Sequence, residues 1–178
     1  AIASRNSIGV EVSFGDRILK CQALDQFDFS RVDIVLMSAG GKISKEWSEK
    51  IGKAGPIVID NSSAFRMDPD VPLIVPEVNP DAVSYAHKKN IIANPNCSTA
   101  QLVVALKPLH DRATIKRVVV ATYQSVSGAG KEDAAERFTQ TRAVFVSDPI
   151  EHKQFPKRIA FHLIPQHDLF MEDGFTKD

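Results

Sequence analysis

The sequence has no excess charge of either sign and no long hydrophobic run. Its 22 Lys and Arg residues balance 22 Asp and Glu residues, so the chain has no general electrostatic field to attract nucleic acid or an anionic membrane surface. Its apolar stretches, such as 32–37 and 102–106, fall far short of the roughly 20 residues that cross a bilayer. These absences argue against nucleic acid and membranes as partners.

Cysteine is scarce as well. Only Cys21 and Cys97 occur, far apart in a sequence without a recognisable secretory signal, so we expect free thiols in a reducing, cytoplasmic setting. With 178 residues, 43% of them hydrophobic, the chain can bury a core without a disulfide or a metal ion. We therefore predict a folded protein with no metal site.

The pattern of hydrophobic residues predicts an α/β fold. Short runs rich in Val and Ile alternate with longer amphipathic stretches, which is typical of βαβ units and a mainly parallel sheet. The predicted strands are 32–37, 56–60, 90–93, 115–124 and 158–164, with a short strand at 73–75 inside a proline-rich connection. The predicted helices run from an N-cap at Ser44 to residue 53, from Ser98 onward, and over 132–142.

Small residues and glycines follow several of these strands. Residues 38–41 (Ser-Ala-Gly-Gly), 61–63 (Asn-Ser-Ser) and 125–130 (Ser-Val-Ser-Gly-Ala-Gly) each come directly after one. Open α/β sheets bind ligands at this carboxyl edge, where backbone N–H groups can approach a phosphate or a nicotinamide. Neither glycine-rich turn fits the G-x-G-x-x-G pattern, and a lone turn of this kind is more often only a turn.

Cys97 is the strongest candidate for a catalytic residue. It stands between Asn96 and Ser98, after a predicted strand and before a predicted helix. Unpaired N–H groups and the helix dipole favour the ionised thiolate at such a place, and a thiolate attacks carbonyl carbon readily. The alternative is a small buried hydrophobic residue, which is the role we predict for Cys21.

Arg66 is a weaker candidate. It follows the turn at 61–63, and its guanidinium could bind a carboxylate or a phosphate, although a surface arginine is the alternative. A nucleophilic cysteine commonly works with a histidine base. None of the five histidines lies in a convincing motif, and each is as well explained by a solvated or structural role: His87, His110, His152, His162 and His167.

Five segments together resemble the aspartate-semialdehyde dehydrogenase family over almost the whole chain: ASRNSIG, MSAGGKISKEW, VIDNSSAFRMDPDVPLIVPEVN, NIIANPNCSTAQLVVALKPLHD and VVVATYQSVSGAGKE. The resemblance implies a Rossmann-like, mainly parallel but incomplete sheet in a truncated dinucleotide-binding domain at 1–93. The first part of an α+β catalytic and dimerisation domain would follow at 94–178. The family's GATGxVG loop is expected before Ala1 and its acid/base histidine after Asp178, so we expect these residues alone to be poorly active.

The resemblance also assigns roles. Cys97 would be the nucleophile, Gln124 a catalytic and substrate-positioning residue, Asn96 a substrate-orienting residue and Arg66 the arginine that holds the phosphate. The cofactor would be NADP, held by residues after three strands: Ser4, Arg5, Asn6, Ser7, Ala39, Gly40, Ser127 and Gly128. Relatives often carry arginine at the place of Asn6, so Arg5 would have to reach the 2′-phosphate.

The implied reaction is the reductive dephosphorylation of 4-aspartyl phosphate, with release of phosphate, in lysine, threonine and methionine biosynthesis. The family's assembly implies a homodimer or homotetramer for the full-length protein. Three alternatives stay open: an N-acetyl-glutamyl-phosphate reductase, whose cysteine turn is similar, the aldehyde-phosphate dehydrogenase of glycolysis, and a non-catalytic α/β fragment that only binds a nucleotide or a partner.

Overall fold

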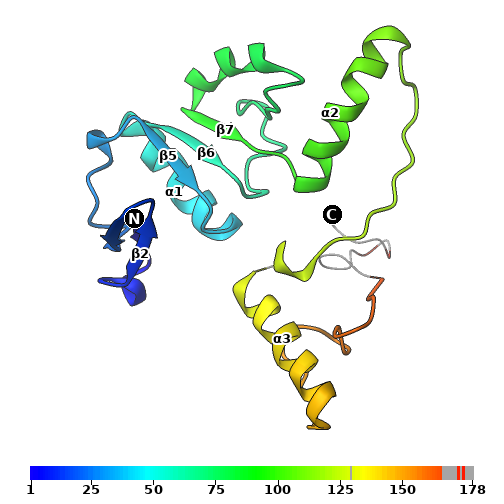
Figure 1. Ribbon diagram of the computed structural model, residues 1–178. Helices are drawn as coiled ribbons and strands as arrows, with labels where there is room; N and C mark the ends of the chain where they lie inside the picture. Colours follow the sequence, from blue (N-terminus) through cyan, green and yellow to red (C-terminus); the bar gives the residue numbers. More distant parts are fainter. Residues whose placement is uncertain (129, 166–171, 173, 175–178) are drawn as a thin grey trace. The chain divides into compact units, whose positions relative to one another are not determined.

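The chain forms two compact units, Ala1–Val118 and Val119–Asp178, which are described separately (Figure 1). The structure is a computed structural model, and it describes residues 1–128, 130–165, 172 and 174. Among these residues no helix is long and apolar enough to span a membrane.

A parallel three-stranded sheet is the centre of the first unit. Its strands lie in the order β5 (Ile34–Met37), β6 (Ile57–Asp60) and β7 (Ile91–Ala93). Beyond β7, the predicted strand at 73–75 is reduced to a single parallel bridge between Leu73 and Ala93. The predicted strands at 32–37, 56–60 and 90–93 therefore form a parallel sheet, and the Rossmann-like α/β class is confirmed.

Helix α1 (Gly41–Lys53) connects β5 to β6 and packs against the sheet. Ile51 of this helix is buried against Val58 of β6, and Trp47 packs on the same core. Eight buried apolar side chains of the described residues form one cluster at the core of this unit: Phe29, Met37, Ile51, Val58, Phe65, Val71, Ile91 and Ala93. Burying such side chains is the main force that holds helix and sheet together.

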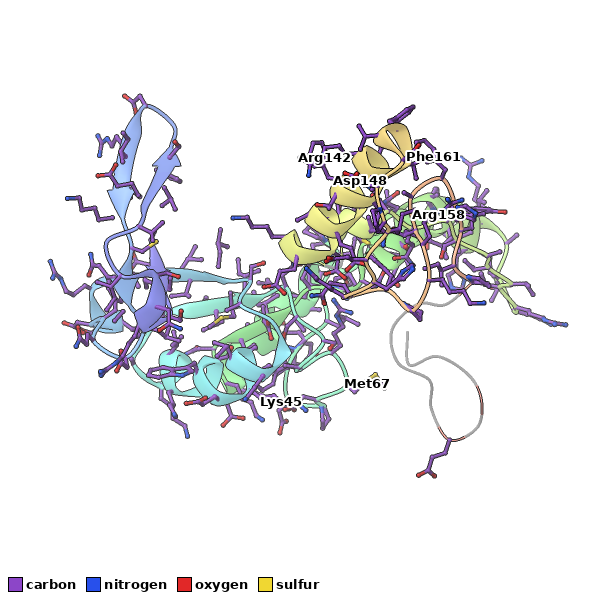
Figure 2. The ribbon with its side chains drawn as sticks, turned by 90° about the horizontal axis from the view of Figure 1, so that it is seen from below. Lys45, Met67, Arg142, Asp148, Arg158 and Phe161 are labelled. Carbon is purple, nitrogen blue, oxygen red and sulfur yellow. The ribbon has the colours of Figure 1, made fainter. Side chains whose placement is uncertain are left out.

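The N-terminal part of this unit carries four short strands, which form two pairs: β1 (Ile2–Ala3) parallel with β4 (Gln22–Ala23), and β2 (Glu11–Phe14) antiparallel with β3 (Arg17–Lys20). Gly15 opens the hairpin turn with a φ of 59°, a left-handed conformation that glycine adopts without strain. The hairpin projects from the unit (Figure 2), and Phe14 at its end is 70% exposed.

Helix α2 (Cys97–Arg112) follows β7 and buries none of its residues, so Leu109 of the apolar face is 59% exposed. The described residues also form four 3-10 helices: η1 (Arg5–Ser7), η2 (Phe29–Arg31), η3 (Pro80–Lys88) and η4 (Val126–Gly128). The predicted helix after Cys97 is confirmed.

The second unit is organised around helix α3 (Lys131–Val146), which confirms the predicted helix at 132–142. Gln140 on this helix is 1% exposed. Its Oε1 accepts the N–H groups of Ile159 (2.9 Å) and Ala160 (3.3 Å), and its Nε2 donates to the carbonyl of Glu151 (3.0 Å). One buried amide therefore fastens residues 151–160 to the helix.

The predicted strand at 115–124 is wrong. The segment has no regular secondary structure, and no strand of the described residues pairs with it. It is an irregular connection from α2 to η4 (Figure 1), and Val119 in its middle is 80% exposed. The propensity of Val and Tyr for strands expresses how well they fit a pleated, half-buried surface, and this segment meets no such surface.

The predicted strand at 158–164 is also wrong, because local and long-range bonds break the extended run. The N–H groups of Ile159 and Ala160 donate to Oε1 of Gln140 and not to a neighbouring strand. Phe161 has a φ of 63°, and His162 donates its N–H to the carbonyl of Ile159 (3.0 Å), which closes a turn.

The predicted helix cap at Ser44 is wrong as well. The helix begins at Gly41 with Gly40 at the N-cap, and the N–H of Ser44 donates to the carbonyl of Gly40 (3.0 Å). Ser44 therefore lies inside the first turn. Its hydroxyl is 2.5 Å from Oδ2 of Asp60, to which it donates a hydrogen bond instead of capping the helix.

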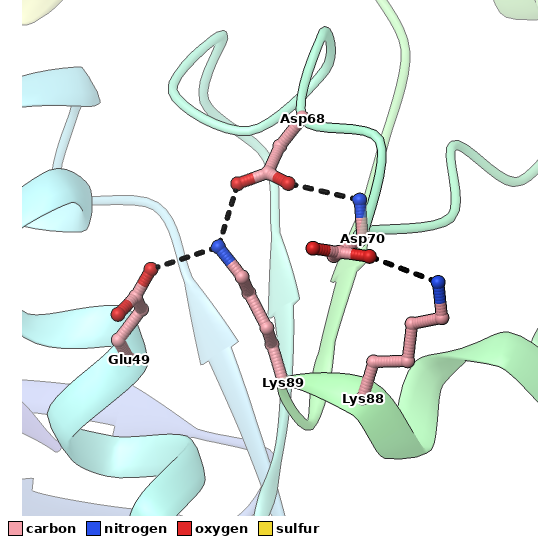
Figure 3. Close-up of polar contacts among 5 residues, drawn as sticks. All are labelled: Glu49, Asp68, Asp70, Lys88 and Lys89. Carbon is pink, nitrogen blue, oxygen red and sulfur yellow. Dashed lines mark hydrogen bonds and ion pairs between the residues drawn. The ribbon is translucent and has the colours of Figure 1, made fainter.

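An ion-pair network ties α1 to the proline-rich connection and to the end of η3 (Figure 3). Nζ of Lys89 lies 2.8 Å from Oδ2 of Asp68 and 3.1 Å from Oε1 of Glu49, and Lys88 pairs with Asp70 at 2.8 Å. The hydrogen bond from Lys89, assisted by the N–H of Asp70, lowers the pKa of Asp68. Asp68 in turn raises the pKa of Lys89, with Glu49 adding to the effect.

We predict that Asp68→Asn lowers the thermal midpoint by roughly 1–3 °C at neutral pH. A carboxyl whose pKa is lower when folded stabilises the protein above its unfolded pKa, and this contribution is lost as the pH falls through the folded pKa. The difference between wild type and variant should therefore begin to shrink as the pH falls toward about 4, and vanish only below the lowered pKa of folded Asp68. Thermal unfolding followed over a pH series measures it. Asp16→Asn, in the exposed hairpin turn, is the matched control; an equal or pH-independent effect of Asp68→Asn would contradict the role of the pair.

Candidate active site

The carboxyl ends of the three central strands are level with one another. Met37 of β5 is opposite Asp60 of β6, and Asp60 is opposite Ala93 of β7. The turns that follow these residues, at 38–40, 61–63 and 94–96, therefore lie side by side at one edge. This is the edge at which open α/β sheets bind ligands, and it brings together three of the segments that the sequence predicts to be functional.

Cys97 is the first residue of α2, and its side chain is exposed. Asn96 is the N-cap, and its Oδ1 accepts the N–H of Ser98 at 2.8 Å. The thiol therefore stands at the positive end of a sixteen-residue helix and is open to a substrate. Cys21 is 8% exposed, and both cysteines are free thiols as predicted.

Arg66 lies beside the loop that leads to Cys97. Its Nε donates to the carbonyl of Asn94 (2.9 Å), and its Nη2 donates to the carbonyl of Asn61 (3.4 Å). The side chains of Asn94 and Asn61 also bond to each other, with 2.7 Å between Nδ2 and Oδ1. The guanidinium is thus anchored by two carbonyls that come from the turns after β6 and β7.

The turn after β5 is open on its outer side. Gly40 has a φ of 84°, and a Cβ added to it would meet no atom within 4 Å, so the space over the turn is open. No side chain caps the first turn of α1. An exposed turn of this kind, with backbone N–H groups at the start of a helix, allows the close approach that a phosphate or a nicotinamide needs. Ala39 and Gly40 therefore suit the predicted cofactor role.

The predicted cofactor residues near the N-terminus follow β1. Ser4 precedes η1, which holds Arg5, Asn6 and Ser7. Nε and Nη2 of Arg5 bond the same carboxylate oxygen of Asp25, at 2.9 and 2.5 Å, and this bond raises the pKa of Arg5 and lowers the pKa of Asp25. A 2′-phosphate would have to share Arg5 with Asp25 or displace it.

The remaining predicted site residues belong to the second unit. Gln124 is exposed and its Nε2 donates to Oγ1 of Thr122 at 3.2 Å. Ser127 and Gly128 form part of η4, where Oγ of Ser127 is 2.9 Å from Oγ of Ser125. Their roles stay predictions.

Three of the four described histidines, His87, His110 and His162, bond within their own parts of the chain. Nδ1 of His87 is 2.6 Å from the carbonyl of Ser84, and Nδ1 of His110 accepts the N–H of Ile115 at 3.2 Å. His167 lies outside the described residues. No group of three or more His, Cys, Asp or Glu among the described residues could hold a metal ion.

Sequence reasoning gave no role to three residues at this edge, namely Asp60, Asn61 and Asn94. Asn61 and Asn94 are contacts of Arg66; Asn61 lies in the turn predicted at this edge, and Asn94 directly follows the predicted strand at 90–93. Asp60 is completely buried at the end of a strand that is otherwise apolar. An aspartate that ends an apolar strand is the one local signal that could have drawn attention to it.

Comparisons with known proteins show which family the chain is similar to. Two family models match the chain: "Semialdehyde dehydrogenase, NAD binding domain" at residues 1–86, and "Semialdehyde dehydrogenase, dimerisation domain" at residues 106–178. The aspartate-semialdehyde dehydrogenase of Aquifex aeolicus is 53% identical over 178 residues, which are 99% of this chain and 52% of that protein. The chain thus spans about half the length of the curated relatives it matches.

Solved structures are similar too. Aspartate semialdehyde dehydrogenase II from Vibrio cholerae, complexed with ASA, matches with a TM-score of 0.95 and 48% identity, over 99% of this chain and 52% of that one. The Candida albicans enzyme with NADP matches with a TM-score of 0.52 and 28% identity, over 64% of this chain and 39% of that one. None of these names is that of N-acetyl-glutamyl-phosphate reductase or of a glycolytic enzyme.

We predict that iodoacetamide at neutral pH labels Cys97 at least about tenfold faster than Cys21, because Cys97 is exposed at a helix N-terminus and Cys21 is buried. Peptide mapping of the time course measures both rates in one sample, so Cys21 is an internal control. In denaturant the two rates should converge. Equal, slow labelling of both thiols in the folded chain would contradict the site.

Proposed function

The chain belongs to the semialdehyde dehydrogenase family, and from this we propose that its protein converts 4-aspartyl phosphate to aspartate 4-semialdehyde by NADP-dependent reductive dephosphorylation. The observation that carries the proposal is the bond from Arg66 to the carbonyl of Asn94. Asn94 stands three residues before the exposed Cys97, so the side chain proposed to bind phosphate contacts the short loop that leads to the nucleophile.

The first half of the reaction follows from these residues. The sulfur of Cys97 attacks the acyl carbon of the substrate, a C–S bond forms, and the C–O bond to phosphate breaks. Arg66 binds the phosphate and neutralises the charge that it carries away. Asn96 orients the substrate, and the N–H groups of the first turn of α2 stabilise the oxyanion. The product of this half is a thioester on Cys97 and free phosphate.

The second half releases the aldehyde. A bound nicotinamide dinucleotide supplies the hydride that reduces the thioester carbonyl. Cys97 then leaves as a thiolate when the C–S bond breaks, which the start of a helix favours. Gln124 positions the substrate, and the proton transfers need an acid/base group that we assign to no described histidine.

NADP is the proposed cofactor. Ala39 and Gly40 would hold it at the turn after β5, and Ser127 and Gly128 at η4. Ser4, Arg5, Asn6 and Ser7 would hold the adenosine ribose, where serine hydroxyls and a guanidinium suit a 2′-phosphate. The NADP in the related Candida albicans structure supports this choice. NAD is the alternative cofactor, because it shares the nicotinamide chemistry of NADP.

The wider context follows from the proposed activity. Residues 1–93 would be the dinucleotide-binding part and 94–178 the first part of the catalytic and dimerisation domain. The protein would be a cytoplasmic homodimer or homotetramer that acts in lysine, threonine and methionine biosynthesis. The dimerisation-domain model that matches 106–178 supports self-association.

We predict that Cys97→Ser, made in the complete enzyme that carries this sequence, lowers kcat by on the order of 10³ or more, because the nucleophile is lost. The dissociation constant for NADPH, measured by fluorescence titration, should stay within about twofold. Cys21→Ser is the matched control and should keep its activity. Turnover retained by Cys97→Ser would refute the mechanism, and wild-type turnover of N-acetyl-glutamyl phosphate in place of 4-aspartyl phosphate would refute the substrate.

A further inference from the structure

We propose that Asp60 is a positioning residue of this active site, whose buried carboxylate sets the turn that orients Arg66 toward the phosphate of the substrate. The inference rests on the proposed function for the identity of the substrate. It concerns a residue that touches neither substrate nor cofactor and acts through Arg66.

The carboxylate of Asp60 joins two elements at the ligand edge. It is 0% exposed, and so is Ser44 in the first turn of α1. Oδ2 accepts the hydroxyl of Ser44 (2.5 Å) and the hydroxyl of Ser62 (3.0 Å), while Oδ1 accepts the N–H of Ser62 (2.8 Å). Ser44 is itself bonded through its N–H to the carbonyl of Gly40 (3.0 Å). The turn after β5 and the turn after β6 are therefore fastened to one side chain.

Backbone hydrogen bonds connect the same strand ends to the two turns that hold Arg66. The N–H of Asn61 donates to the carbonyl of Met37 (2.9 Å), and the N–H of Asn94 donates to the carbonyl of Asp60 (2.8 Å). The turn that Asp60 holds presents the Asn61 carbonyl to Arg66, and the neighbouring turn presents the Asn94 carbonyl. A change in the shape of the turn at 61–63 thus moves an anchor of the guanidinium.

The chemistry of Asp60 favours this role over simple packing. Burying a carboxyl group is costly unless hydrogen bonds compensate. The bonds recorded for this carboxylate come from two hydroxyls and one backbone N–H, and none from a cation. A Val or Leu at the end of this apolar strand would pack without that cost. The carboxylate adds directional bonds: two to Ser62 fix the conformation of the turn, and one to Ser44 ties the turn to α1.

The test is a double-mutant cycle in the complete enzyme, run in the phosphate-consuming direction with aspartate semialdehyde, NADP and inorganic phosphate. Asp60→Ala should raise KM for phosphate by about tenfold and change kcat by less than about threefold, since a displaced binding group weakens phosphate binding more than chemistry. Asp60→Asn, which keeps the size and one acceptor, should restore part of the loss. In an Arg66→Gln background, Asp60→Ala should have almost no further effect on this KM.

Asp68→Asn is the matched control, because Asp68 is an aspartate of the same unit that serves only the ion-pair network of Figure 3. It should leave KM for phosphate unchanged. Protection of Cys97 from iodoacetamide by inorganic phosphate gives a second readout that needs no turnover, and it should weaken in Asp60→Asn if Asp60→Ala does not fold. An unchanged phosphate KM, or effects of Asp60 and Arg66 that simply multiply, would overturn the positioning role. A wild-type enzyme with no turnover of aspartate semialdehyde would instead overturn the proposed function.

Discussion

The register of three parallel strands is the constraint on which the rest of the structure depends. Because Met37, Asp60 and Ala93 stand opposite one another, the turns after β5, β6 and β7 leave the sheet at the same level. A shift by one residue would turn the buried side chain of Asp60 to the other face of the sheet and separate it from Ser44. The apolar core favours this register, since Val58 and Ile91 pair with each other and are both completely buried.

Because of this register, three neighbouring turns carry the groups proposed for three different roles. The turn after β5 is open and contains no side chain that obstructs it, which suits a cofactor. The turn after β6 carries Arg66, and the turn after β7 presents Cys97 at the start of a helix. Each group is weak alone: a cysteine at a helix N-terminus is common, and so is a surface arginine. What joins them is the bond from Arg66 to the carbonyl of Asn94, three residues before Cys97, and this is the arrangement that the proposed acyl-phosphate site requires.

Much of this could be predicted from local sequence, and the failures have a common physical cause. The central strands were predictable because short runs rich in Val and Ile that end at turn residues leave a strong signal, and the start of α2 because Asn96 is a good N-cap. The hairpin of β2 and β3 was overlooked although Gly15 in an alternating pattern signals it. The strands expected at 115–124 and 158–164 depended on distant partners, and Gln140 takes the N–H groups of the second one. The role of Asp60 rests on Ser44, sixteen residues away, which no local pattern reveals.

The central claim is that one thiol at this edge accepts the acyl group of the substrate. The most direct measurement is mass spectrometry of the complete enzyme mixed with 4-aspartyl phosphate in the absence of cofactor, followed by peptide mapping. We predict an aspartyl group bound to Cys97 as a thioester that hydroxylamine removes, because the nucleophile can be acylated before any reduction. An enzyme that stays unmodified, or an adduct on Cys21, would contradict the claim.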